Sequence, residues 1–281
     1  RKYQEEAINN VILGFKTHDR GKLIMACGTG KTFTSLKLAE RQVGKHGLVL
    51  FLVPSLALLS QTLDDWTQQS KDKMTAIPVC SDSTIGASGS LLDPEDDSPE
   101  SFLADHELSY PATTDAKSLA EKVVTAFARY DTRTDLGLTV VFSTYQSLDV
   151  IHEAQEQYGM VNFDLIICDE AHRTAGAYLF NDLKEKEKSK ANKGKSKKAV
   201  EPSTEDVLAP QSADAPDWDV EAESLFTRIH NEQYIHGSKR LYMTATPKIY
   251  GKKPKEQEGL GDAVLYSMDN EQIFGPVFYS L

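Results

Sequence analysis

The sequence predicts an α/β domain, a parallel β-sheet with helices on both faces that carries two low-complexity insertions. Short apolar runs alternate with helical patterns along most of the 281 residues. The apolar residues of those runs occupy consecutive positions, which is typical of strands buried on both faces of a parallel sheet. Two stretches lack this alternation. The chain is long enough to bury a sizeable core, as one large domain or two smaller ones.

The elements follow one another in a regular order. A helix precedes the first strand, and a helical stretch stands after most of the later strands. Because strands joined by helices run parallel, their carboxyl ends meet at one edge, where ligands of such sheets bind. The predicted strands are Lys22–Cys27, Leu48–Pro54, Thr75–Cys80, Leu138–Ser143, Phe163–Cys168 and Arg240–Thr244. The predicted helices are Tyr3–Thr17, Thr32–Val43, Leu56–Gln68, Ala116–Tyr130 and Leu148–Tyr158.

The two insertions are predicted from composition. Residues 83–109 form an acidic insertion, within a segment, 81–116, that holds nine acidic residues and no Lys or Arg. Residues 184–222 begin with eight Lys and two Glu in 184–198 and continue as a Pro-, Ser- and acid-rich stretch. Such segments bury too little apolar surface to offset their chain entropy, so we expect surface insertions. A DNA-gripping basic arm at the lysine-rich tract stays open as the alternative.

Charge and cysteine usage restrict the class of protein only loosely. The net charge is −11, but outside the acidic segments and the lysine tract the chain is near neutral, which neither supports nor excludes a nucleic-acid partner. The three cysteines form no C-x-x-C pair, which favours reduced thiols and a cytoplasmic protein. No apolar run has membrane-spanning length, and no signal sequence is visible. The opening at Arg1, inside a helical pattern, suggests a piece of a longer chain.

The stretch "MACGTGKT", residues 25–32, has the composition of a phosphate-binding loop. Gly28 and Gly30 allow a tight turn whose N–H groups face an anion, and the following helix adds its positive N-terminal end. Lys31 can reach the β- and γ-phosphates, and the hydroxyl of Thr32 can bind Mg²⁺. Met25 departs from the usual pattern, which has glycine there. The alternative is a plain strand-to-helix turn with a solvated lysine.

The stretch "FDLIICDEAHR" places two adjacent carboxylates, Asp169 and Glu170, at the end of an apolar strand. Adjacent acids in such a place are costly without a cation. Mg²⁺ bound to a triphosphate supplies one, which Asp169 can hold directly or through water. Glu170 can then orient and deprotonate the attacking water. A strand end with solvated acids is the alternative, and the glycine loop at a suitable separation disfavours it.

With "GTGKT", "DEAH" and "YMTATP" in this order, the chain resembles the first RecA-like motor domain of a superfamily 2 helicase or translocase of the DEAH-box type. That family tolerates replacement of the first loop glycine. The resemblance implies that Lys31 and Thr32 hold phosphate and Mg²⁺, with Asp169 as a further metal ligand and Glu170 as catalytic base. It also implies that three residues couple hydrolysis to movement: His172, Thr244 and Thr246.

The resemblance extends to weaker motifs. "RKYQEEAI" is similar to the family's adenine-reading segment, in which the amide of Gln4 can pair with adenine. The implied ATP-binding residues are Gln4, Cys27, Gly28, Thr29, Gly30, Lys31 and Thr32. "VPSLALLSQT" and "STYQSL" resemble the strand-gripping motifs, which position a strand without reading its sequence. The implied DNA-binding residues, expected at loop-to-helix junctions, are Pro54, Ser55, Thr144 and Tyr145.

Finer details, including "DEAHRTAG" and the ending "EQIFGPVFYSL", most resemble the motor of Type I and Type ISP restriction–modification enzymes. That resemblance implies ATP-driven translocation on double-stranded DNA, with nuclease, methyltransferase and target-recognition parts elsewhere in the polypeptide. We therefore expect residues 1–281 to be the N-terminal lobe of a two-lobed motor, with 262–281 beginning the linker to the second lobe. Such a lobe alone should be nearly inactive as an ATPase, because the second lobe supplies the arginine fingers.

Three other functions remain open from the sequence. An RNA or general nucleic-acid helicase lobe would use similar backbone contacts. A nucleic-acid-binding module without hydrolysis is disfavoured by the intact Lys31, Asp169 and Glu170. A different phosphate-loop enzyme, such as a small-molecule kinase, would lack stimulation by polynucleotide.

Overall fold

The computed structural model describes residues 1–71, 73–80, 112–128, 137–179, 225–250 and 263–281. Both predicted insertions, 83–109 and 184–222, lie outside these residues. Across the described part of the chain, no helix combines the length and apolar character needed to cross a membrane.

A seven-stranded sheet forms the centre of the molecule, in the order β3-β4-β2-β5-β7-β1-β9, and every neighbouring pair is parallel. The predicted parallel sheet is thus confirmed, with all six predicted strands present and a seventh added. The strands are β1 Arg20–Ile24, β2 Leu48–Val53, β3 Thr75–Val79, β4 Thr139–Thr144, β5 Leu165–Cys168, β7 Arg240–Thr244 and β9 Val277–Ser280. A separate antiparallel pair joins β6 Gly176–Leu179 to β8 Ala263–Tyr266.

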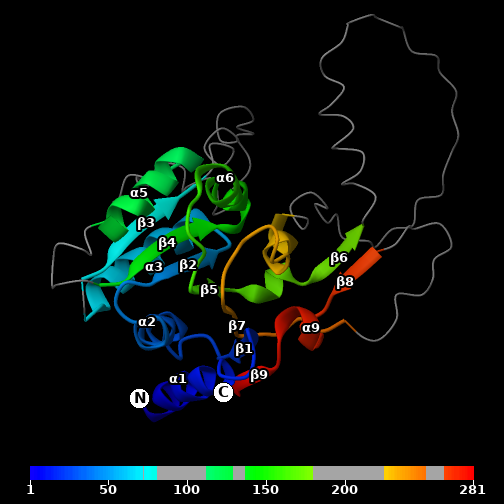
Figure 1. Ribbon diagram of the computed structural model, residues 1–281. Helices are drawn as coiled ribbons and strands as arrows, with labels where there is room; N and C mark the ends of the chain where they lie inside the picture. The colour runs from blue at the N-terminus through cyan, green and yellow to red at the C-terminus, as the bar shows by residue number, and fades with distance from the viewer. Residues whose placement is uncertain (72, 81–111, 129–136, 180–224, 251–262) are drawn as a thin grey trace, which may run out of the picture.

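Helices cover both faces of this sheet, as the uninterrupted apolar strands predict. In β2 all six side chains are buried, with Leu48, Leu50 and Leu52 in one hydrophobic core and the alternate residues in the other. The first core contains α5 Ala116–Ala128 and α6 Leu148–Tyr158, which lie together in Figure 1. The second contains α1 Lys2–Gly14, α2 Lys31–Gln42 and α3 Leu56–Gln69.

Local sequence sets where two of these elements begin and end. β1 ends at Ile24, before the predicted Cys27, because the chain turns there: the N–H of Thr29 donates to the carbonyl of Ala26 over 3.3 Å. α3 begins after Ser55, whose hydroxyl accepts from the N–H of Leu58 over 3.4 Å as an N-cap. Both turns lie at the carboxyl-end edge of the sheet.

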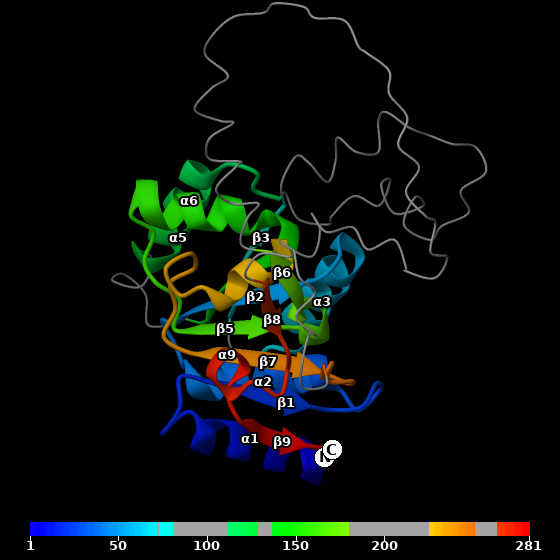
Figure 2. The same cartoon turned by 90° about the vertical axis from the view of Figure 1, so that its right-hand side faces the viewer.

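The C-terminal residues, where the sequence predicts the start of a linker at 262–281, contain a strand and a short helix. Residues 277–280 form β9, which pairs with β1 and completes the sheet on that side (Figure 2). The ring of Phe278 packs edge-on against Phe15 of the α1 side, with centroids 5.2 Å apart. A short helix, α9 Glu271–Phe274, leads into this strand and buries Phe274. These residues pack as part of the domain, and the linker to a second lobe stays a prediction.

Candidate nucleotide site

The carboxyl ends of three neighbouring strands, β5, β7 and β1, bring the predicted site residues to one edge of the sheet. The loop that contains Gly28 and Gly30 follows β1 and leads into α2. Asp169 and Glu170 directly follow β5, and Thr244 is the last residue of β7. Adjacency of strands in the sheet, rather than in the sequence, is what makes these motifs neighbours.

The loop after β1 has the backbone that phosphate binding requires. Gly28 and Gly30 have φ angles of 75° and 86°, in the left-handed region that favours glycine. Gly30 is also the N-cap of α2, so the helix starts with Lys31 and its free N–H groups face the loop. A Cβ at Gly30 would come within 2.6 Å of Nε2 of Gln4, the movable end of a side chain, so the positive φ angle is what disfavours any other residue here.

α1 closes this loop from the other side. Nε2 of Gln4 and the hydroxyl of Tyr3 both donate to the carbonyl of Thr29, each over 3.1 Å. The structure thus brings the predicted adenine-reading amide to the phosphate loop, although its contact with a base stays a prediction. Cys27 lies in the same loop with its thiol exposed. Sequence reasoning missed Tyr3, and its position beside Gln4 was the signal that could have pointed to it.

Lys31 and Glu170 meet across the edge. Nζ of Lys31 lies 3.4 Å from Oε1 of Glu170, which is loose for an ion pair. The other carboxylate oxygen lies 3.3 Å from Nδ1 of His172. Glu170 also has a φ angle of 46°, which is uncommon for a residue other than glycine. The carboxylate is therefore held between two cationic or polar groups rather than turned out to solvent.

The carboxylate of Asp169 has the features expected of a cation ligand. Its Oδ1 is buried and has no hydrogen-bond partner. Burial, reinforced by the neighbouring carboxylate of Glu170, raises the pKa of Asp169 to about 6. A buried, unpartnered carboxylate oxygen beside a phosphate loop fits a Mg²⁺ ligand. The part of the chain that the structure describes holds no cluster of three or more His, Cys, Asp or Glu side chains that could hold a metal ion.

The predicted coupling residues form a chain of contacts. Nδ1 of His172 lies 3.1 Å from the hydroxyl of Thr244, and that hydroxyl accepts from the N–H of Thr246 over 3.2 Å. Burial is the largest of several effects that lower the pKa of His172. The turn after β5 is thereby connected to the segment after β7. The coupling role itself stays a prediction.

The four predicted DNA contacts occupy the expected junctions, but three of the four residues, Pro54, Thr144 and Tyr145, are buried. Ser55 caps α3, and Pro54 precedes it at the end of β2. Thr144 is buried and hydrogen-bonds the hydroxyl of Ser147 over 2.9 Å. Tyr145 is fully buried, and its hydroxyl donates to the backbone carbonyl of Asp169 over 2.8 Å. The hydroxyl of Tyr145 thus supports the end of β5, which no sequence pattern indicated, and the DNA contact of this residue stays a prediction.

Comparison with known proteins identifies relatives of this architecture. Residues 1–249 match the model of the family described as Type III restriction enzyme, res subunit. The structure of the ATP-dependent Type ISP restriction-modification enzyme LlaBIII bound to DNA is similar over 100% of this chain and 15% of its own, with a TM-score of 0.64 and 35% identity. A nuclease-deletion mutant of the Type ISP enzyme LlaGI, in complex with a DNA substrate mimic, is similar over 100% of this chain and 19% of its own, with a TM-score of 0.63 and 32% identity.

Among curated proteins, a protein named "Probable helicase A859L" from African swine fever virus is 29% identical over 178 residues, which is 63% of this chain and 16% of the relative. The chain thus spans less than a fifth of the length of the relatives described here. The two Type ISP structures are similar over the whole of this chain, and all three relatives are much longer than it.

Proposed function

Since the chain belongs to the Type III restriction enzyme res subunit family, we propose that it is the ATP-binding lobe of a DNA translocase motor of a restriction–modification enzyme. The observation that carries this proposal is the edge where Lys31, Asp169 and Glu170 meet. A phosphate loop, a buried carboxylate with one unpartnered oxygen and a second carboxylate 3.4 Å from the loop lysine are the parts that phosphoryl transfer to water needs. Two DNA-bound structures of Type ISP enzymes at 35% and 32% identity support the choice of polymer.

Each residue has a defined task in this proposal. When ATP and Mg²⁺ are bound, the metal neutralises charge on the phosphates. Lys31 exchanges its loose contact with Glu170 for charge-assisted hydrogen bonds to phosphate oxygens. Asp169 and Thr32 hold the metal, and the N–H groups after Gly28 hold the phosphates. Glu170, released from Lys31, accepts a proton from the attacking water.

The partners in the proposal are double-stranded DNA and further parts of the same polypeptide. Backbone groups at the Ser55 and Thr144 junctions would meet DNA phosphates, because both lie at the carboxyl ends of neighbouring strands, β2 and β4. A second RecA-like lobe would supply the arginines that stabilise charge on the γ-phosphate. The lobe described here would then bind ATP and turn it over only slowly when alone.

Turnover of ATP by the natural polypeptide that contains these residues tests the proposal. We expect double-stranded DNA to stimulate hydrolysis, and Lys31→Ala to abolish it by removing the main cationic contact to the phosphates. Lys45→Ala, at an exposed lysine after α2, is the control and should hydrolyse ATP normally. Stimulation by RNA and not by DNA would mean that the motor acts on RNA. Absence of any polynucleotide effect would favour a small-molecule phosphotransferase.

A further inference from the structure

His230 connects the catalytic turn to the neighbouring strand although it lies outside every motif that the sequence analysis singled out. It ends a short 3-10 helix, η6 Arg228–His230, and its ring is buried. Nε2 lies 3.0 Å from the carbonyl oxygen of Thr174, and Nδ1 lies 3.1 Å from the hydroxyl of Tyr242. Because a carbonyl can only accept, Nε2 carries the hydrogen, and Nδ1 accepts from Tyr242.

Both partners of His230 belong to the candidate site's scaffold. Thr174 is the last residue of the 3-10 helix η5 Ala171–Thr174, the catalytic turn that begins immediately after Glu170. Tyr242 lies on β7, two residues before Thr244. His172, inside the same turn, contacts Thr244 over 3.1 Å. The catalytic turn is therefore joined to β7 at two points, each time through a histidine.

The catalytic turn requires such support because of its first backbone angle. Glu170 adopts φ 46°, ψ 44°, a left-handed conformation that is unfavourable outside glycine and persists only where the surroundings enforce it. The hydroxyl of Tyr145 holds the preceding carbonyl, that of Asp169, over 2.8 Å. His230 holds the other end of the turn, four residues further on.

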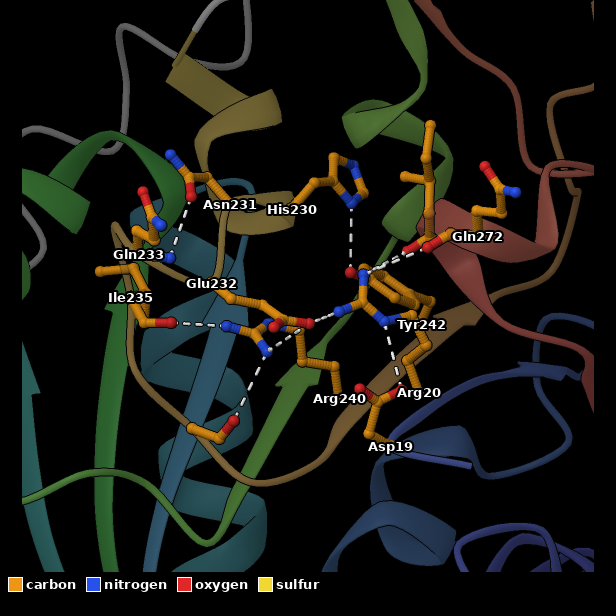
Figure 3. A network of polar contacts seen from close by, with 12 residues as sticks. Asp19, Arg20, His230, Asn231, Glu232, Gln233, Ile235, Arg240, Tyr242 and Gln272 are labelled. Carbon is orange, nitrogen blue, oxygen red and sulfur yellow. Dashed lines mark hydrogen bonds and ion pairs between the residues drawn. The ribbon is translucent and has the colours of Figure 1, made fainter. Parts of the chain in front are cut away.

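The surroundings of His230 fix its ring in place. The ring stacks on Tyr266 with centroids 5.0 Å apart at 17°, and meets Phe274 edge-on at 4.6 Å and 69°. Two residues further along the chain, the carboxylate of Glu232 lies between the guanidinium groups of Arg20 and Arg240 (Figure 3). The backbone that carries His230 is thereby tied to the amino ends of β1 and β7.

We propose that His230 is a positioning residue that holds the catalytic turn so that Glu170 faces the attacking water. This role rests on the proposed ATP hydrolysis and assigns to that site a residue from outside its motifs. Burial lowers the pKa of His230 to about 3, so the ring keeps one donor and one acceptor at neutral pH. The donor is used by the hydrogen bond to the carbonyl of Thr174, and the acceptor by the hydrogen bond from the hydroxyl of Tyr242.

The test compares His230→Phe with His152→Phe in the natural polypeptide. Phenylalanine at 230 keeps the stacking on Tyr266 but loses both hydrogen bonds. His152 is the matched control, because it stacks on Tyr234 at 4.2 Å and 18° and hydrogen-bonds that residue's carbonyl over 2.8 Å, away from the catalytic turn. Displacing Glu170 should lower kcat roughly tenfold to a hundredfold in His230→Phe. Calorimetric affinity for ATP should stay unchanged, and His152→Phe should keep its kcat.

A conservative variant separates positioning from packing. The amide of His230→Gln can donate to the carbonyl of Thr174 and accept from Tyr242, so it should recover most of the lost kcat. Normal kcat in a folded His230→Phe variant, or an equal loss in His152→Phe, would overturn the proposal. If His230→Phe does not fold, Tyr242→Phe decides, because it removes only one of the two contacts. It should lower kcat by roughly twofold to fivefold, and an unchanged kcat would again overturn the role. An unmodified polypeptide without ATP turnover would instead refute the proposed function.

Discussion

At the amino ends of β1 and β7, Arg20 and Arg240 lie side by side in register, whereas at the carboxyl ends of the same sheet the charges are the adjacent acids Asp169 and Glu170. The arginines share the carboxylate of Glu232, and Arg240 also donates to the backbone carbonyl of Ile235. The acids have one loose lysine contact at 3.4 Å and one buried oxygen without a partner.

This difference separates a structural charge cluster from a ligand-binding one. At the amino-end edge, each guanidinium meets acceptors from the protein itself, and only Nε of Arg240 is left without one. At the carboxyl-end edge, the protein provides two carboxylates whose contacts within the protein are incomplete, so a cation and an anion can still bind there. Neutralising a buried charge should therefore harm the fold at the first edge and relieve it at the second.

The largest expected effect concerns ATP hydrolysis by residues 1–281 without the rest of the polypeptide. We expect purified residues 1–281 to bind ATP but to hydrolyse it roughly 10³–10⁵ times more slowly than the natural polypeptide with DNA, because a second lobe must supply the arginines. Single-turnover measurements on both proteins check this. Rapid DNA-stimulated turnover by residues 1–281, lost in Lys31→Ala, would show that this edge is complete by itself.

The next largest effect tests the predicted catalytic base, Glu170. In the natural polypeptide, Glu170→Gln should lower turnover by roughly 10²–10⁴ while ATP affinity is retained, because an amide cannot take the proton from water. Glu153→Gln, the same change at an exposed position of α6, should leave both quantities unaltered. Comparable turnover in Glu170→Gln and the unmodified enzyme would place the base elsewhere.

The two edges also differ in how far the sequence predicts them. The two predicted carboxylates directly follow an apolar strand, and the predicted lysine follows the loop after another, so the order of strands and motifs was enough to predict that Lys31, Asp169 and Glu170 converge. Arg20, Glu232 and His230 meet only through tertiary contacts, and the segment that carries the last two has neither helical nor strand periodicity. β9 escaped prediction for a related reason: as an edge strand it is half exposed, and it exists through its pairing with β1.

The amino-end edge should lose stability when its buried cation is removed. Arg240→Met leaves the carbonyl of Ile235 without its donor, and we expect the free energy of unfolding to fall by about 1–3 kcal/mol. Arg41→Met removes an exposed ion pair with Glu5, in which the nitrogen and oxygen lie 2.6 Å apart. This substitution should change the free energy of unfolding by less than about 0.5 kcal/mol. Chemical denaturation measures both. Equal effects of the two substitutions would mean that the amino-end cluster is no more than a surface ion pair.

At the carboxyl-end edge, removing a buried charge should instead raise the free energy of unfolding. Burial raises the pKa of Asp169 from 3.8 to about 6, so the folded state binds a proton more tightly than the unfolded state does. The ionised carboxylate therefore costs stability above pH 6, and this cost disappears as the pH falls through 6 toward 3.8. Asp169→Asn carries no charge at any pH and should raise the free energy of unfolding at pH 7.5 by about 1–2 kcal/mol, somewhat less than the full shift because of residual solvent screening.

Asp164 provides the matched control, because it stands just before β5 as Asp169 stands just after it. Its carboxylate accepts from the N–H of Leu48 over 2.8 Å, a bond that an amide oxygen can also accept, so Asp164→Asn should bring no gain. Denaturation of both variants without nucleotide or Mg²⁺, at pH 7.5 and near pH 4, measures the difference. A gain for Asp169→Asn only at pH 7.5 is the expected result. A loss at pH 7.5 would mean that the carboxylate is satisfied within the protein, and this edge would then resemble the arginine edge instead of a cation-binding site.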